Sequence, residues 1–529
     1  MTGVRASRLP YPVRPIQDIL SRAARELPSK VAVVDGDRRF TYRELDDYSS
    51  RFAAALAALG VAKGDRVGIM APNCTEFEIA FFGIVRAGAV ATTLNSAYQQ
   101  REIAHQINDS GAETLIVHEA LEGMAKEARD ATPGLRRLIV IKPTSEDPES
   151  FWGLLENALA RPPSIPIHPQ QDLAALPYSS GTTGLSKGVM LTHHNLTCNL
   201  EQFTRRPGEE ASYRRDDVFL VHLPLFHIYG LQVLMNAVIH VGATQVLMGR
   251  FDMELFLNLV SQHQVTQLYT VPPVGLGLTQ YPGVEKVDLT SLRVGFLAAA
   301  PCSQDLQDRV SQVLNCPVIQ GYGMTELSPI SNVDFMEADR LRSGSVGPVL
   351  ADTEERVVDL EDGATELPLG EVGELLVRGP QVMKGYHNNP QATAETITPD
   401  GWLHTGDIVR MEQDGNVWIL DRKKELIKYK GFQVPPAELE GLLLEHPGVA
   451  DAAVIGKPDV ESGEIPKAFV VRKSGMDPSA EDLMGFVSGQ VATFKQVREV
   501  EFVDSIPKNP SGKILRRLLL EQERARVAS

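Results

Sequence analysis

Residues 178–188 read Tyr-Ser-Ser-Gly-Thr-Thr-Gly-Leu-Ser-Lys-Gly, and no other stretch of the sequence is as informative. Its glycines let backbone N–H groups turn toward an anion, its hydroxyls add donors, and Lys187 adds a positive charge. These features suit a polyphosphate ligand. The run is not a Walker A loop, because Ser186 precedes the lysine and Gly188 replaces the Ser or Thr that would hold magnesium. The alternative is a flexible surface loop, but such loops rarely combine this hydroxyl density with an embedded lysine.

Six further motifs follow this run along the chain. They are His-Leu-Pro-Leu-Phe-His at 222–227, Gln-Gly-Tyr-Gly-Met-Thr-Glu at 320–326, Gly-Glu-Leu-Leu-Val-Arg-Gly at 373–379, Gly-Trp-Leu-His-Thr-Gly-Asp at 401–407, and the segments 421–434 and 507–513. In this order the motifs resemble the adenylate-forming superfamily of acyl-CoA synthetases, peptide-synthetase adenylation domains and beetle luciferases. Residues 424–434, Lys-Glu-Leu-Ile-Lys-Tyr-Lys-Gly-Phe-Gln-Val, are most similar to the 4-coumarate–CoA ligase group.

The resemblance implies a two-step reaction. A carboxylic acid and ATP would form an acyl-adenylate and pyrophosphate, and coenzyme A would then take the acyl group and release AMP. The chain is therefore expected to be an AMP-forming acid–CoA ligase that uses ATP, Mg²⁺ and CoA.

Periodicity predicts an α/β fold. A hairpin is expected at 31–42 around Asp-Gly-Asp, and Thr41 with Glu44 forms a capping box that begins a helix. Strands are expected at 66–70 and 88–93, with a helix from about residue 75. This alternation continues to about residue 340 and indicates layers of helix and parallel sheet.

The pattern then changes to short strands, and a boundary is expected after residue 421. Residues 1–421 are predicted to form a large N-terminal AMP-binding domain of several α/β subdomains. Residues 422–529 are predicted to form a small α+β domain with strands at 449–455, 467–472 and 499–503. The resemblance implies that this small domain is mobile and rotates between the two half-reactions.

Composition sets further limits. The chain has 529 residues and a formal net charge of −16, so a broad surface for nucleic acid or anionic membrane is not expected. Its four cysteines form no Cys-x-x-Cys pair, which favours a reducing cytoplasm. No signal peptide is expected, and the most apolar candidate span, residues 231–248, is interrupted by polar side chains. We expect a cytoplasmic monomer or homodimer without a transmembrane segment.

The nucleotide site is implied by the resemblance. Asp407 and Arg422 would contact the ribose, Tyr322 would stack on adenine, and Glu326 with Thr182 would hold magnesium. Lys513 would bridge the carboxylate and the α-phosphate and is expected to be catalytic, together with Lys187 and His227. The full set for ATP and AMP is Ser179, Ser180, Gly181, Thr182, Thr183, Gly184, Lys187, Gly321, Tyr322, Gly323, Thr325, Asp407, Arg422, Gln433 and Lys513.

The acid and CoA sites are also implied by the resemblance. Lys424 resembles the hinge residue, and Arg250, Lys430 and Gly431 resemble contacts to CoA. The acid is assigned to His227, Tyr229, Ala299, Gln320, Gly321, Lys424 and Lys428. Without the motif context, the lysines of 423–430 would be a solvated strand edge, and some of them fit that interpretation.

The segments that would line the acid pocket are 226–230, 296–301, 320–325 and 327–330. They contain no Asp, Glu, Arg or Lys. A second charge on the acid would be buried without a partner, so dicarboxylates and amino acids should be rejected. The resemblance favours a 4-coumarate-like or cinnamate-like aryl acid, and a medium- or long-chain fatty acid is the alternative.

Four other functions share these motifs. An amino-acid adenylation domain would place a carboxylate after Phe226, where His227 stands. An acyl–carrier-protein ligase remains open, although residues 430–431 favour CoA. A luciferase-like enzyme also remains open. A non-catalytic scaffold would have no need to keep Lys187, Glu326 and Lys513 together.

Overall fold

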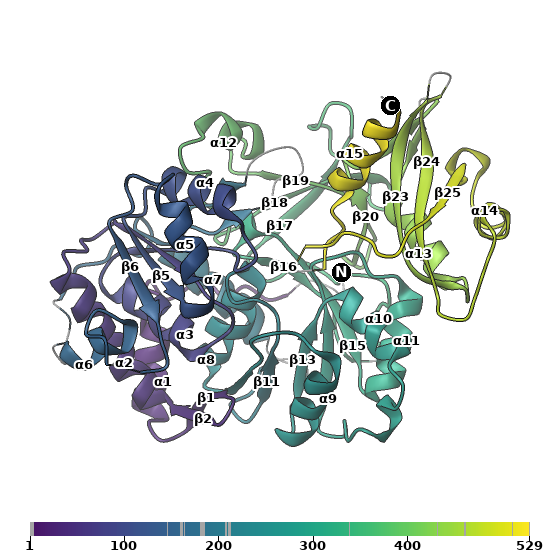
Figure 1. Cartoon of the computed structure of the whole chain (residues 1–529). Helices are drawn as coiled ribbons and strands as arrows, with labels where there is room; N and C mark the ends of the chain where they lie inside the picture. The colour runs from purple at the N-terminus through teal and green to yellow at the C-terminus, as the bar shows by residue number, and fades with distance from the viewer. Residues whose placement is uncertain are drawn as a thin grey trace.

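The computed structural model describes residues 5–144, 146–158, 162, 164–179, 186–206, 209, 213–337, 339–430, 432–459, 462–509 and 512–527 (Figure 1). Two sheets with helices packed around them form the larger part of the molecule. The first sheet has eight strands, which are parallel from β1 to β15 and carry antiparallel strands β2 and β16 at its edges. In spatial order they are β16 (Ile330–Val333), β15 (Val318–Gly323), β14 (Val294–Leu297), β13 (Gln267–Thr270), β11 (Val218–Val221), β12 (Thr244–Leu247), β1 (Val31–Asp35) and β2 (Arg38–Thr41).

The second sheet has six strands. In spatial order they are β10 (Leu191–Thr192), β7 (Leu173–Ala175), β4 (Val90–Thr93), β3 (Arg66–Met70), β5 (Thr114–His118) and β6 (Arg137–Ile141). The helices of these two layers are α1 (Asp18–Glu26), α2 (Tyr42–Ala58), α3 (Thr75–Arg86), α4 (Gln100–Ser110), α5 (Glu122–Arg129), α6 (Phe151–Asn157), α7 (His193–Thr204), α8 (Ala237–Val241), α9 (Met253–Gln262), α10 (Pro272–Gln280) and α11 (Gln304–Leu314). Parallel neighbours need such crossovers, so the expected α/β layering is confirmed.

Local sequence signals explain several of these boundaries. β1 and β2 pair antiparallel around Gly36, and the predicted capping box of Thr41 and Glu44 is present at the start of α2. β3 has its predicted bounds. β4 begins two residues later than predicted, because Gly88 has a φ of +71° and turns the chain.

A four-stranded antiparallel sheet follows. It consists of β17 (Glu354–Val358), β18 (Val372–Arg378), β19 (Leu403–Met411) and β20 (Val417–Arg422), with α12 (Pro390–Thr396) between β18 and β19. β20 ends at Arg422, one residue beyond the predicted boundary.

The last hundred residues form a separate layer at the right of Figure 1. Its sheet contains β22 (Phe432–Val434), β21 (Ile427–Tyr429), β24 (Gly463–Arg472), β23 (Val449–Asp459) and β25 (Glu499–Phe502), and its helices are α13 (Pro436–Glu445), α14 (Ala480–Ser488) and α15 (Arg516–Val527). The three predicted strands are present, and the β21–β22 hairpin adds to them. The segment between β25 and α15 runs back toward the large sheets (Figure 1).

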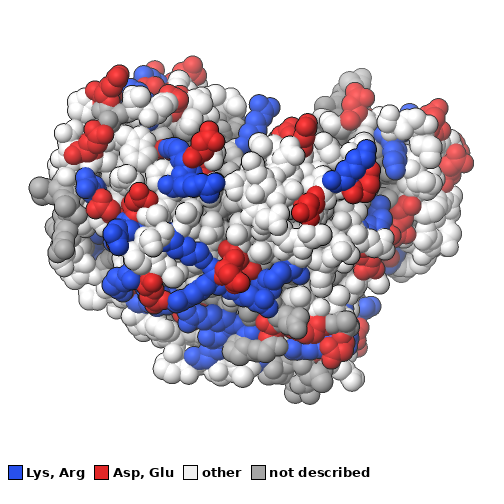
Figure 2. Space-filling model, turned by 90° about the horizontal axis from the view of Figure 1, so that it is seen from below, with Lys and Arg blue, Asp and Glu red and all other residues white. Residues whose placement is uncertain are grey.

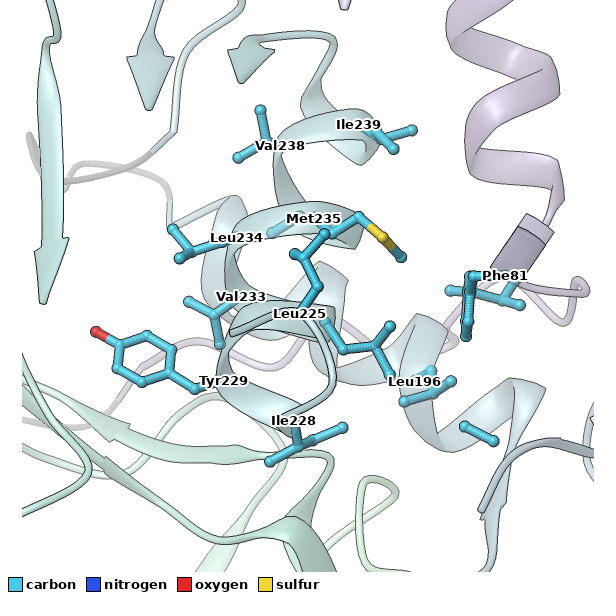
Figure 3. Packing of buried hydrophobic residues seen from close by; sticks show 14 of the residues in the cluster. Phe81, Leu196, Leu225, Ile228, Tyr229, Val233, Leu234, Met235, Val238 and Ile239 are labelled. Carbon is cyan, nitrogen blue, oxygen red and sulfur yellow. The ribbon is translucent and has the colours of Figure 1, made fainter. Parts of the chain in front are cut away.

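The apolar stretch at 231–248 is part of the core. It forms most of η2 (Tyr229–Asn236), a π-helix, and continues into α8 and β12. Figure 3 shows these helical turns packed against Leu196, Leu225 and Phe81, while the Tyr229 ring points away toward neighbouring strands. No helix among the described residues is long and apolar enough to cross a membrane.

Charge is unevenly distributed over the surface. The view from below shows Lys and Arg side chains gathered in a band, with acidic residues interspersed (Figure 2). The elements at that end of the molecule include α1, which carries Arg22 and Arg25, and β2, which carries Arg38 and Arg39. This face is therefore richer in Lys and Arg than the net charge of −16 for the whole chain would suggest.

The contact between α2 and α3 generates a stability prediction. A Cβ at Gly83 would lie 2.7 Å from the Phe52 ring, whereas a Cβ at Gly123 in α5 meets nothing within 4 Å. Gly83→Ala should lower the free energy of unfolding by about 1–3 kcal/mol because the packed ring must move. Gly123→Ala should be neutral or stabilising by up to about 1 kcal/mol. Thermal unfolding midpoints test this pair, and equal midpoints would contradict it.

Candidate functional site

The two ends of the predicted phosphate loop are joined as a short ribbon. β8 (Tyr178–Ser179) pairs antiparallel with β9 (Lys187–Gly188), which sets Ser179 opposite Lys187. The Tyr178 hydroxyl donates to Asp109 at 2.6 Å and anchors one strand. The loop between the strands, with Ser180, Gly181, Thr182, Thr183 and Gly184, lies outside the described residues. Lys187 is thereby fixed at the point where the loop ends.

Lys187 and Glu326 meet at a tyrosine that the sequence analysis did not single out. The Lys187 ammonium lies 4.2 Å from the centroid of the Tyr386 ring. The Tyr386 hydroxyl donates to Glu326 Oε1 at 2.8 Å, and both side chains are buried. The only sequence signal for Tyr386 is that it closely follows the 373–379 motif. Thr325, beside Glu326, is half-buried.

A second group of predicted site residues surrounds a buried carboxylate. Asp407 is 2% exposed, accepts a hydrogen bond from the Tyr322 hydroxyl and forms an ion pair with Arg422, whose Nε lies 2.9 Å from Oδ1. Strands β19 and β20 place Asp407 and Arg422 opposite each other. Burial and the neighbouring Asp407 raise the pKa of Tyr322, while Asp407 raises the pKa of Arg422. This arrangement brings together three residues predicted to bind the nucleoside.

The C-terminal loop reaches the same place. Lys513 is held by a backbone bond to Asn509 Oδ1 of 2.8 Å, and a Cβ on Gly512 would lie 3.0 Å from Pro273 of the large region. Burial, followed by the charge of Arg422, lowers the pKa of Lys513 to about 8. The Lys513 ammonium therefore lies close to Arg422 and Asp407, which precede it by 91 and 106 residues in the sequence.

The residues predicted to contact the acid differ in their surroundings: some are buried together, and others are exposed. Burial lowers the pKa of His227 to about 4, and its Nδ1 accepts from the Tyr229 backbone at 3.2 Å, so the neutral ring carries its proton on Nε2. Gly321 lies against Phe296, where a Cβ would be 2.3 Å from the ring. Ala299 is exposed and has a φ of +73°, so its predicted contact with the acid stays a prediction.

Two predicted residues are engaged elsewhere in the fold. The Gln320 amide donates to Gln307 Oε1 at 2.7 Å and to the Cys302 carbonyl at 3.2 Å, which ties β15 to α11. At Gly323 a Cβ would lie 2.1 Å from the Pro329 carbonyl oxygen, so the residue type follows from close backbone packing. Neither observation tests a contact with substrate.

The predicted hinge and CoA residues lie on exposed surfaces. Lys424, Lys428 and Lys430 are all exposed, and Lys430 has a φ of +48° at the tip of the β21–β22 hairpin. Gly431 lies outside the described residues, as does the side chain of Gln433. Arg250 is exposed beside a cleft of about 390 Å³ lined by Gly249, Phe251, Pro273, Asn509 and Gly512, among others.

Comparisons with known proteins identify the family. Residues 20–387 match the family model described as AMP-binding enzyme, and residues 438–513 match the AMP-binding enzyme C-terminal domain. The chain belongs to the AMP-binding enzyme family. This AMP-binding enzyme is similar to 4-coumarate–CoA ligase 1 of Solanum tuberosum, with 41% identity over 510 residues that cover 95% of the chain and 92% of the relative.

Solved structures of CoA ligases have the same fold as this chain. An anthranilate CoA ligase in complex with anthranoyl-AMP superposes with a TM-score of 0.91 at 28% identity, covering 98% of this chain and 99% of the other. A benzoate CoA ligase from Burkholderia xenovorans gives a TM-score of 0.86 at 27% identity, covering 96% and 100%. The predicted fold, the superfamily and the enzyme class, an AMP-forming acid–CoA ligase, are confirmed. AMP-binding CoA ligases use ATP and CoA; the roles of individual residues stay predictions.

Proposed function

We propose that this AMP-binding enzyme converts an aryl acid of the 4-coumarate or cinnamate type into its CoA thioester through an acyl-adenylate. The relatives named above act on 4-coumarate, anthranilate and benzoate, all of which carry a ring. Three side chains near the predicted pocket are aromatic and contact one another: the rings of Tyr269 and Phe296 stack with centroids 4.5 Å apart, and Tyr229 meets Phe296 edge-on at 6.4 Å. An aryl group would find apolar partners there.

The observation that carries the proposal is the position of Lys513. In the first half-reaction a carboxylate oxygen bonds to the α-phosphorus of ATP, and the bond to pyrophosphate breaks. Charge that develops on the phosphate is stabilised by fixed cations. Lys513 supplies an ammonium beside Asp407 and Arg422, which would hold the ribose, and Lys187 supplies one at the phosphate loop.

Magnesium is proposed to bind at Glu326. The Tyr386 hydroxyl donates a hydrogen bond to Oε1 of Glu326, and Oε2 of Glu326 accepts no hydrogen bond from the described residues. One carboxylate suits Mg²⁺, which usually combines one or two carboxylates with substrate phosphates and water. When bound, the ion would neutralise phosphate charge. No group of three or more His, Cys, Asp or Glu residues in the described part of the chain could hold a metal without substrate.

The proposed division at residues 421 and 422 separates two functions. The first region carries most of the predicted nucleotide and acid contacts, and the second carries both Lys513 and the exposed hairpin with Lys428 and Lys430. Because Lys513 lies at the site while the hairpin faces solvent, this conformation suits adenylate formation. In the second half-reaction the CoA sulfur bonds to the acyl carbon and AMP leaves, which would require the small domain to rotate.

The direct test is a substrate panel. Pyrophosphate release and thioester formation should be measured with 4-coumarate, cinnamate, benzoate, octanoate, acetate and succinate. Cinnamic acids should give the highest kcat/KM, and succinate should be poor because its second charge would be buried without a partner. Octanoate as the best substrate would replace the aryl acid with a fatty acid. No thioester with any acid would reject the proposal.

Lys513 should serve the first half-reaction only. Lys513→Ala should slow acid-dependent pyrophosphate release by about 10²–10³-fold or more, the usual cost of losing one charge-stabilising donor. Conversion of supplied acyl-adenylate and CoA should be nearly unchanged. Equal losses in both half-reactions would contradict this role.

The same lysine predicts a pH dependence. Its pKa is lowered to about 8, so the ammonium is present below that pH and is lost as pH rises through it. The kcat/KM for adenylation should therefore fall above about pH 8, because kcat/KM reports the free enzyme. Lys513→Arg, which stays charged, should be slower but lack this alkaline decline. The same decline in both proteins would assign it to another group.

Lys430 should serve the second half-reaction. Lys430→Glu should raise the KM for CoA and leave adenylate formation largely intact, because it reverses a charge expected to face CoA phosphates. Lys473→Glu, at another exposed position of the small domain, is the matched control. Equal effects of the two substitutions on the KM for CoA would make Lys430 an ordinary surface lysine.

A further inference from the structure

Tyr386 contacts both charged groups at the phosphate end of the site through different parts of one side chain. Its ring faces the Lys187 ammonium at 4.2 Å, and its hydroxyl donates to Glu326 at 2.8 Å. No ion pair joins Lys187 to Glu326 in the described part of the chain, although they carry opposite charges and share this neighbour. The tyrosine therefore separates them.

The backbone around Tyr386 is bonded to both partners' segments. Met190 N–H donates to the Gly385 carbonyl at 3.0 Å, and His387 N–H donates to the Gly188 carbonyl at 2.8 Å, so this segment runs alongside the residues that follow Lys187. Met383 N–H donates to the Glu326 carbonyl at 2.8 Å. Residues 383–387 thus form the physical link between the phosphate loop and the turn that carries Glu326.

Separation matters chemically. A lysine paired directly with a glutamate would offer less charge to a phosphate, and the glutamate would offer less to a cation. A ring face attracts an ammonium weakly enough to release it to a stronger anion. A phenol hydroxyl can orient one carboxylate oxygen while the other stays available.

We propose that Tyr386 is a positioning residue that keeps Lys187 and Glu326 apart and aims the first at ATP phosphates and the second at Mg²⁺. The proposal rests on the proposed function, because it assumes that these two groups receive nucleotide and metal. It adds Tyr386 to the site, with the ring positioning Lys187 and the hydroxyl positioning Glu326.

Two substitutions distinguish the role of the Tyr386 ring from that of its hydroxyl. Tyr386→Phe keeps the ring and removes the hydroxyl, so the Mg²⁺ concentration needed for half-maximal pyrophosphate release should rise about tenfold or more, as expected for a lost bond to a charged group. The binding of ATP without Mg²⁺ should be nearly unchanged. Tyr386→Leu removes both contacts, so it should also weaken metal-free ATP binding by roughly 2–30-fold.

Tyr11→Phe is the matched control. Tyr11 is also 6% exposed and its hydroxyl also donates to a carboxylate, that of Asp352, at 2.6 Å, but it contacts neither Lys187 nor Glu326. Tyr11→Phe should leave both the Mg²⁺ requirement and ATP binding unchanged. Thermal midpoints of all variants show whether folding is intact.

ATP binding by calorimetry, with and without Mg²⁺, supplies a readout that needs no turnover. If the wild type binds ATP but forms no thioester with any acid, the proposed function fails while the Tyr386 comparison still stands. Tyr386→Phe with the Mg²⁺ dependence of the wild type would overturn the proposal. So would Tyr386→Phe and Tyr386→Leu with equal losses of metal-free ATP binding.

Discussion

The Asp407 carboxylate is buried at the place where the large sheets meet the C-terminal layer, and a buried charge is stable only when it is paired. Arg422 and the Tyr322 hydroxyl supply that pairing from two different strands. Arg422 is the last residue of β20, so the same pair fixes the point from which the small domain departs. The positions of the residues predicted to bind adenylate and of the predicted domain boundary thus depend on the same interaction.

Two cations, Arg422 and Lys513, lie near this carboxylate. Burial, followed by the charge of Arg422, lowers the pKa of Lys513, while the charges of Glu425 and Asp407 act in the opposite direction. The negative charge of a nucleotide bound at the predicted site would favour the ammonium form of Lys513.

Local signals in the sequence predicted local structure well. The β1–β2 hairpin, the Thr41 capping box and the bounds of β3 depend on residues a few positions apart. The family resemblance also gathered Tyr322, Asp407, Arg422 and Lys513, which the structure brings together. Tyr386 was missed because its contacts join three distant segments, and no short pattern records that. The exposure of Ala299 and the internal hydrogen bonds of Gln320 likewise depend on packing that periodicity does not encode.

The loop that carries Lys513 has one more structural role. Asn509 and Gly512 form part of the wall of the cleft beside Arg250, so the cleft has its present shape only while that loop is docked. A displacement of that loop would therefore change the shape of the cleft and move Lys513 away from Arg422 and Asp407 at the same time.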